Sequence, residues 1–500
     1  MNVTSTLFIV YMIATIILTI YSGIKTSKMK TDAGDAYLLA GRTLSWILIF
    51  FGTFGAATGG TATVGAVGNV YLIGISAAFY GFSRGSLYIF DGIVAHKIRA
   101  TKSTNPAGMF GAAFTPKDSV FFTFVMGIAL LGATTAQVMA AAAVIPTVFP
   151  NISMSTAITV CAILFGGITL IGGFLSMNLT NVVNSSFILI GMFVCLIGGL
   201  HIGGGWSNIT AQLPSDPKWL SLTSGGFPVY MMIAFLLSQG PKICESGDWL
   251  GVKSAKSDRD ARIGFIAAGL FQYGLAVCVG FIGIIAVVLL PGLKSSSSAL
   301  SMLAVRVSPF VGALCVAGVY AAATSCAQGW LLSCSNVFLD VFKQITKKSY
   351  ESKKEVIIMR ALVVVCTFIC WIMAMRAQSI VTFVVNMTTA TMPFAVCAWA
   401  LYYFPKYLRK STCTLTFILN MIVFFGWFVT PILSNYFPHV VFPMLIACAI
   451  GLVLPLVYDK TMIDPRVIYT EEYLKSPKCN IHMNYVLPDK QSVSSSREDA

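Results

Sequence analysis

The chain has 500 residues, of which 56% are hydrophobic and only 10% are charged, and its mean hydropathy is +0.81. A water-soluble domain carries roughly 25% charged residues because its surface faces water. At roughly 20 apolar residues per crossing, this chain has enough apolar sequence for a dozen or more transmembrane helices. The composition therefore excludes a soluble globular fold and predicts an all-α integral membrane protein.

The net charge of +14 does not indicate a nucleic-acid partner. Lys and Arg occur in short clusters between apolar runs, with no continuous basic face and no platform of interleaved aromatic residues. The 13 Cys are scattered, mostly inside apolar runs and without a CxxC motif, and the 4 His lie far apart in sequence. This spacing argues against a disulfide framework or a zinc site. We expect the cysteines to be small buried hydrophobic residues.

In chain order, thirteen apolar runs are predicted to form one transmembrane helix each. The first run lacks a basic leader and a small-residue cleavage site, so it is expected to be a retained helix. The polar tail after the last run is expected to be flexible. The runs lie near residues 4–24, 44–74, 76–96, 118–147, 153–176, 180–204, 225–250, 263–291, 301–342, 356–378, 379–404, 413–436 and 440–458.

The positive charges predict the orientation of these helices. If the N-terminus lies outside and each run crosses once, nearly all of the 33 Lys and Arg residues fall in cytoplasmic loops and the tail. Only Lys218, Lys294 and Arg376 fall on the outer side. Cytoplasmic loops of membrane proteins carry an excess of Lys and Arg, and one miscounted helix would destroy the alternation. We therefore predict a multi-pass protein of the cell membrane with its N-terminus outside and its C-terminus in the cytoplasm.

Two of the runs contain residues that interrupt a helix. The second run concentrates Gly and Thr over residues 52–65, and the seventh contains Gly240 and Pro241. Backbone can unwind at bilayer depth only where it lines a cavity or is buried in protein. Interrupted helices at corresponding positions of two five-helix halves indicate the binding site of an inverted-repeat transporter. The alternative is that the small residues simply allow close helix packing.

Four stretches carry a resemblance to a known family. They are Tyr37–Trp46 (YLLAGRTLSW), Ile168–Ser176 (ITLIGGFLS), Ala321–Asp340 (AAATSCAQGWLLSCSNVFLD), and the interrupted seventh run followed by Lys253–Lys256 (KSAK). In this order the chain resembles the sodium:solute symporter family, which has the inverted-repeat fold first seen in a bacterial leucine transporter.

The resemblance implies an organisation along the chain. Residues 1–43 would form the N-terminal helix and a cytoplasmic lead-in, and residues 44–404 a transporter core of two inverted five-helix repeats. Residues 405–458 would form two accessory transmembrane helices, and residues 459–500 a cytoplasmic tail.

The family's sodium site joins carbonyl groups of the first broken helix to oxygens of the ninth helix. Carried over by position, the resemblance implies the carbonyls of Gly55, Thr58 and Ala322 and the side chains of Ser325 and Cys326 as Na+ ligands. A hard cation needs several oxygen ligands, and unwound backbone can supply them. The Ser325 hydroxyl could instead bond to its own helix backbone.

Three residues depart from the family pattern. Cys326 stands where Ser or Thr is usual, and a thiol is a soft, poor ligand for sodium. Asn181 and Asn184 stand where the family usually has Asp and Gln, so a carboxylate near a second cation position is absent. Na+ is the expected coupling ion, and proton coupling and uncoupled transport remain alternatives.

Two cations are expected inside the membrane, where an ionisable group costs roughly 2.5–3.5 kcal/mol or more. Arg84 and Lys242 align with substrate-contacting positions of sugar-carrying family members. Because both side chains are positively charged, they suggest an anionic substrate such as a carboxylate. Alternatively, Lys242 could pair with Glu245, and Arg84 and Asp91, two turns apart on one helix face, could bracket water or a neighbouring helix. Asp248 is expected in a gate or loop salt bridge. The expected substrate-binding residues are Gly59, Ala62, Arg84, Gln239 and Lys242.

The sequence thus predicts a secondary transporter, a sodium-coupled symporter of a small organic solute that could be an organic anion. A transporter-like solute sensor is a second hypothesis, although the tail is short and has no folded-domain pattern. An enzyme is not expected, because no nucleophile–base pair, HExxH motif or paired carboxylates are found. A channel is not expected either, because it would show repeated filter segments and none repeat in this sequence. The expected partners are a solute and the lipid bilayer, with no nucleic acid and no organic cofactor.

Overall fold

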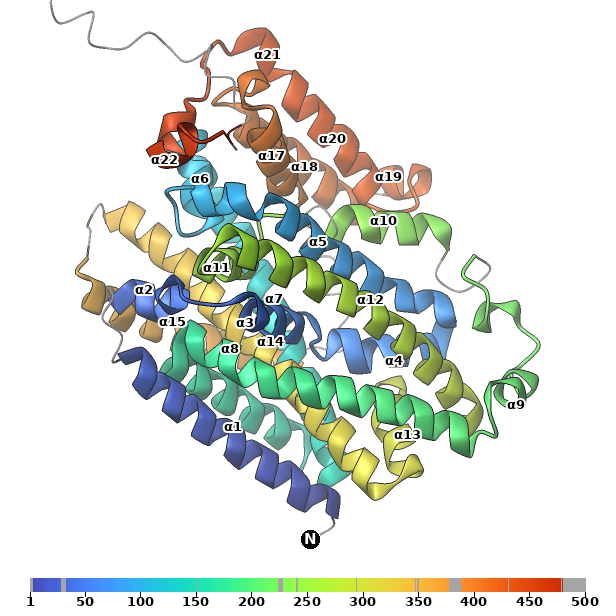
Figure 1. The fold of residues 1–500 in the computed structure, drawn as a ribbon. Helices are drawn as coiled ribbons and strands as arrows, with labels where there is room; N and C mark the ends of the chain where they lie inside the picture. The colour runs from blue at the N-terminus through green and yellow to red at the C-terminus, as the bar shows by residue number, and fades with distance from the viewer. Residues whose placement is uncertain are drawn as a thin grey trace, which may run out of the picture.

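A computed structural model shows helices joined by short links, with no β-strand among the residues that it describes (Figure 1). α3, α7 and α14 lie in the centre of the bundle, and α18 and α20 pack together with α17 at one edge, away from α1 (Figure 1). The described residues are 3–27, 33–149, 151–223, 228–239, 242–293, 295–346, 348, 350–376, 388–429, 431–477 and 479.

The helices follow the apolar runs because a helix satisfies all of its own backbone hydrogen bonds, which a bilayer requires. Their bounds are α1 Val3–Ser27, α2 Ala33–Leu39, α3 Trp46–Ala57, α4 Ala66–Ile73, α5 Phe79–Ala100, α6 Pro106–Ala113, α7 Pro116–Val148, α8 Met154–Ile202, α9 Trp206–Ala211, α10 Val229–Gln239, α11 Ser246–Ser254, α12 Asp258–Leu289, α13 Ala299–Val307, α14 Pro309–Thr346, α15 Ser352–Arg376, α17 Met392–Tyr403, α18 Thr412–Val429, α19 Pro431–Tyr436, α20 Val441–Val453, α21 Pro455–Tyr458 and α22 Glu471–Leu474.

Within the described part of the chain, eight segments are long and apolar enough to cross a membrane. The bent pair formed by α3 and the residues 61–73 makes a ninth. The other predicted crossings coincide with α5, α10–α11, α17 and α18, which are shorter or more polar. The count of thirteen therefore stays a prediction.

Helix α8 contains two of the candidate spans, residues 154–171 and 177–202. Its Phe165 ring lies 5.7 Å from the ring of Tyr320 on α14, and backbone atoms of Phe187 lie beside Gly318 on the same helix. A straight helix would separate Phe165 from Phe187 by about 33 Å. The chain therefore folds back between the two spans, as two separate predicted helices require.

Both predicted helix breaks are present. α3 ends at Ala57, the residues 58–60 leave the α-helical path, and a π-helix over 61–65 leads into α4 at an angle of 58° to α3. In the seventh run, α10 ends at Gln239 and α11 begins at Ser246, with residues 242–245 outside any helix. Gly240 and Pro241 themselves lie outside the described residues.

Glycines bring α5 close to α12. A Cβ atom at Gly81 would lie 2.6 Å from the Cβ of Ala276, and one at Gly92 would lie 2.7 Å from a side-chain carbon of Ile266. A Cβ at Gly269 of α12 would lie 2.5 Å from the carbonyl oxygen of Gly85. Such backbone contact is typical of helix pairs inside membranes. It fixes the polar face of α5, which carries Arg84, against the rest of the core.

The first part of the tail is ordered, contrary to the expectation of flexibility. Tyr469 forms an antiparallel bridge with Thr101, and the Lys102 amide donates to the carbonyl of Ile468 over 2.8 Å. Tyr469 is only 1% exposed. Buried aromatic rings and backbone bonds thus attach this segment to the end of α5, which composition alone does not indicate.

Candidate functional site

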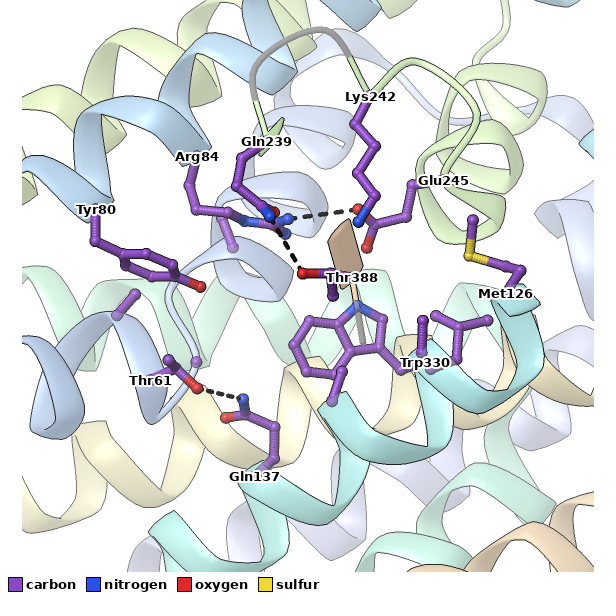
Figure 2. A pocket seen from close by; sticks show the side chains of 16 residues that line it. Thr61, Tyr80, Arg84, Met126, Gln137, Gln239, Lys242, Glu245, Trp330 and Thr388 are labelled. Atoms are coloured by element: carbon purple, nitrogen blue, oxygen red, sulfur yellow. Dashed lines mark hydrogen bonds and ion pairs between the residues drawn. The ribbon is translucent and has the colours of Figure 1, made fainter. Parts of the chain in front are cut away.

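The two broken helices meet at one small cavity in the middle of the bundle (Figure 2). Its volume is about 30 Å³, which is room for roughly two water molecules. The cavity in this structure is therefore smaller than an organic solute. All five residues expected from the sequence to bind substrate line this cavity. Its walls are formed by Ala57, Gly59, Thr61, Ala62, Tyr80, Arg84, Met126, Ala129, Leu130, Ala133, Gln137, Gln239, Lys242, Glu245, Trp330 and Thr388.

Gln137 of α7 stabilises the break between α3 and α4. Its side-chain oxygen accepts a hydrogen bond of 2.6 Å from the backbone N–H of Gly60, and its amide nitrogen lies 3.3 Å from the Thr61 hydroxyl (Figure 2). Buried backbone groups that lose their helical partner need another one. Gln137 was not predicted from the sequence, although an amide inside the apolar run 118–147 is the signal that could have identified it.

The α3 break also packs directly on α7 and α14. A Cβ atom at Gly60 would lie 2.2 Å from the Cβ of Ala140, and one at Gly59 would lie 2.6 Å from the sulfur of Cys326. Both positions therefore require glycine for steric reasons.

The expected Na+ ligands lie where α14 touches the end of α3. The Cys326 sulfur is 2.6 Å from the carbonyl oxygen of Ala56 and 3.7 Å from that of Gly55. The Ser325 hydroxyl donates to the carbonyl of Ala321 at 2.6 Å and approaches that of Ala322 at 3.3 Å. Thus the hydroxyl is bonded to its own helix, and Cys326, rather than Ser325, contacts the unwound region.

The side chains of Thr58, Asn181 and Asn184 also have defined partners. The Thr58 hydroxyl donates to the carbonyl of Phe54 over 2.7 Å, so it is the Thr58 carbonyl that remains for a cation. The amide nitrogen of Asn181 on α8 donates to the carbonyl of Gly52 over 2.9 Å, and the oxygen of Asn184 accepts from the Tyr11 hydroxyl over 2.6 Å. These amides link α8 to α3 and α1 in place of a carboxylate. The described residues hold no cluster of three or more His, Cys, Asp or Glu suited to a metal ion.

The charged residues of the cavity pair differently from either sequence alternative. Arg84 forms an ion pair of 3.4 Å with Glu245, and its other terminal nitrogen donates to the Tyr88 hydroxyl over 2.8 Å. The side chain of Lys242, only 2% exposed, forms no hydrogen bond or ion pair within the described part of the chain, although its ammonium group interacts electrostatically with Glu245. The close Lys242–Glu245 ion pair suggested by the sequence is therefore not formed. Helical spacing did not apply to Lys242 and Glu245, because the link that carries them is not helical.

A second cavity, also of about 30 Å³, lies on the side predicted to face the cytoplasm. It shares Arg84, Glu245 and Trp330 with the first cavity and is also lined by Asp248 and Phe265. The ion pair and the indole ring of Trp330 thus separate two hollows along one path through the protein. Neither Trp330 nor the role of Glu245 in this barrier was predicted.

A family model matches residues 37–244 and 254–431, which is more than half of the chain. The chain belongs to the sodium:solute symporter family. No curated protein sequence matches it. Its function is accordingly sodium-coupled symport of a small organic solute.

Solved structures share the fold of the symporter. A Na+-coupled sialic acid symporter in a substrate-bound, outward-open state is 15% identical with a TM-score of 0.73, covering 92% of this chain and 98% of that one. A nucleobase-cation-symport-1 family transporter in a closed conformation with bromovinylhydantoin is 14% identical with a TM-score of 0.58, covering 84% of this chain and 92% of that one. The symporter therefore has the leucine-transporter-type fold that the resemblance to its family implied.

Proposed function

We propose that the symporter carries a small organic anion, whose negative group binds Lys242 with help from Arg84. The observation that carries this proposal is the buried Lys242 side chain. Its ammonium group lines the cavity and forms no hydrogen bond or ion pair in the described part of the chain. An ionised group at this depth costs roughly 2.5–3.5 kcal/mol or more, and a bound carboxylate would offset that cost. The ionisable residues of the cavity, Arg84, Lys242 and Glu245, sum to a single positive charge, which suits a monovalent anion.

Arg84 would contribute in a different way. Its planar guanidinium can hold a carboxylate with two parallel hydrogen bonds, but one side of it is bonded to Glu245. A solute that reaches Arg84 therefore competes with Glu245. The remainder of the solute would contact the other predicted substrate-binding residues, Gly59, Ala62 and Gln239.

We propose that the coupled Na+ is bound by the carbonyls of Gly55, Thr58 and Ala322 and by Ser325 and Cys326. The approach of Cys326 to the carbonyls of Ala56 and Gly55 supports this location, since it brings α14 against the end of α3. Binding there would require the Ser325 hydroxyl to turn one lone pair towards the ion while it donates to its own helix.

The anion proposal predicts opposite effects for two neighbouring substitutions. Lys242→Gln should lower the affinity for the transported anion at least tenfold, because a hydrogen bond to a charged group contributes about 1.5–3 kcal/mol. Glu245→Gln should be neutral or raise the affinity, because it frees Arg84. The measurement is uptake of labelled solutes into proteoliposomes, with organic anions as competitors.

Protein amount and thermal stability of both variants serve as the control. If no organic anion competes for uptake and both changes only destabilise the protein, Lys242 has a structural role. A neutral sugar or an amino-acid-like solute would then replace the anion.

We also propose that the symporter lies in the cell membrane with its N-terminus outside, as the distribution of Lys and Arg indicates. The link between α14 and α15 should then face the cytoplasm. A cysteine introduced as Tyr350→Cys should react with a membrane-impermeant maleimide only after the cells are opened. Labelling from outside intact cells would overturn this orientation.

A further inference from the structure

Two carboxyl groups lie beyond the Arg84–Glu245 pair, towards the predicted cytoplasmic side. Asp91 lies two turns after Arg84 on α5, about 10.5 Å along the helix axis, and Asp248 lies in the first turn of α11. Asp91 is 0% exposed. The two carboxyl groups interact electrostatically with each other, although they belong to different helices.

These carboxyl groups have few partners. Neither oxygen of Asp91, nor Oδ2 of Asp248, has a hydrogen-bond partner among the residues that the structure describes. No ion pair of either residue is found there. An ionised carboxylate in a membrane interior is expensive unless it is paired, and two such groups in contact repel each other. The pair is therefore expected to bind something that neutralises one charge.

The surrounding groups do not supply that neutralisation. Arg84 is already bonded to Glu245 and Tyr88, and Lys242 lines the solute cavity. With Arg84 and Lys242 positive and Glu245, Asp91 and Asp248 negative, the set carries one excess negative charge. The titratable and charged groups that interact with the pair are Arg84 and Tyr88 on α5, Lys242, Cys244 and Glu245 in the α10–α11 link, and Tyr402 on α17.

Tyr402 provides an independent indication of a ligand. Its side chain is 1% exposed, and its hydroxyl group has no hydrogen-bond partner in the described part of the chain. It interacts electrostatically with Asp91 from a third helix. A hydroxyl group near Asp91 can donate a hydrogen bond to that carboxyl group when it is ionised.

A metal ion suits this site less well than a proton. A hard cation needs several oxygen ligands, whereas no third His, Cys, Asp or Glu completes a metal-binding cluster within the described residues. Two carboxyl groups in contact can instead share one proton and titrate as a unit. That single proton would cancel the excess negative charge.

We propose that Asp91 and Asp248 form a proton-binding site that is separate from the solute and sodium sites and exchanges its proton with the cytoplasmic side. The proton comes from water, joins one carboxylate oxygen of the pair, and returns to water when the pair ionises. No other bond changes. The site would add sensitivity to cytoplasmic pH to sodium-coupled transport.

Infrared spectroscopy of the purified protein, titrated with acid and base in H2O and D2O, tests this proposal without solute or sodium. The protein should show a protonated-carboxyl band that persists at neutral pH and disappears in base. Asp91→Asn and Asp248→Asn should each remove that band at neutral pH. Asp118→Asn should leave it unchanged, because the buried Asp118 carboxylate lies on α7 and accepts hydrogen bonds from Thr115 and Thr414.

Thermal unfolding against pH gives a second measurement. An unfolded aspartate ionises at about pH 4, whereas the folded pair would keep its proton at neutral pH. The melting temperature should therefore fall as pH rises through this range, until the folded pair itself ionises. Asp91→Asn should flatten that fall. The proposal is overturned if the protonated-carboxyl band persists in both variants or if no such band titrates with pH. It is also overturned if Na+ removes the band at constant pH. None of these results depends on an anionic solute, so the two proposals fail separately.

Discussion

Replacing Gly60 with alanine is expected to cause a severe loss of transport and a lower melting temperature. The new Cβ atom would lie 2.2 Å from the Cβ of Ala140, which cannot move unless α7 moves. The backbone at Gly60 has φ −54, which alanine adopts readily, so the whole effect is steric. Overpacking of this kind costs about 1–3 kcal/mol. Uptake into proteoliposomes and thermal unfolding of the purified variant measure both effects.

The second substitution Ala140→Gly should restore much of the loss in the double variant, because it removes the clashing atom. Gly274→Ala on α12 is the matched control, since a Cβ atom there meets nothing within 4 Å. Normal stability and transport of Gly60→Ala would show that α7 does not pack on the break as described.

A second large effect is expected at the sodium site. Ser325→Ala should abolish sodium-driven uptake, because the loss of a ligand to a charged ion costs about 1.5–3 kcal/mol, or roughly tenfold to a hundredfold in affinity. Cys326→Ser should raise the apparent sodium affinity, since a hard oxygen replaces a soft sulfur. Both are measured as solute uptake against sodium concentration.

Thr324→Ala is the matched control, because the Thr324 hydroxyl also bonds to its own helix, at the carbonyl of Tyr320 over 2.7 Å. If Ser325→Ala leaves the sodium dependence unchanged, the transferred site is wrong. Uptake driven by a proton gradient alone would then favour the alternative of proton coupling.

The helices and their breaks could be predicted from sequence because they depend on local patterns. Apolar length locates α7 and α12, and the Gly and Thr residues of 52–65 place the first break within a few residues of where α3 ends. Hydropathy also divides the α8 region correctly into two spans, although Met154–Ile202 is one continuous helical segment without a polar loop between the spans.

The partners of side chains could not be predicted, because they depend on tertiary packing. The sequence places Glu245 three residues from Lys242, but the non-helical link directs Glu245 to Arg84, 161 positions away. Gln137 bonds to Gly60 across 77 positions. The Ser325 hydroxyl bonds to its own helix, as the alternative drawn from the sequence suggested, because a hydroxyl group in a helix has the carbonyl four residues earlier within reach.

The glycine contacts between α5 and α12 have an electrical consequence. They tie Arg84 and Asp91 to α12, whereas Glu245 lies in the α10–α11 link and Asp248 in the first turn of α11. Any movement of the link relative to α5 therefore displaces negative charge within the membrane field. A charge that crosses the whole field is worth about 2.3 kcal/mol per 100 mV. The moving segment also carries Lys242, so its net charge is one negative, and moving that charge across a tenth of the field shifts the balance between conformations by roughly 0.2 kcal/mol per 100 mV. The resting voltage of the cell would thus bias the symporter even before sodium binds.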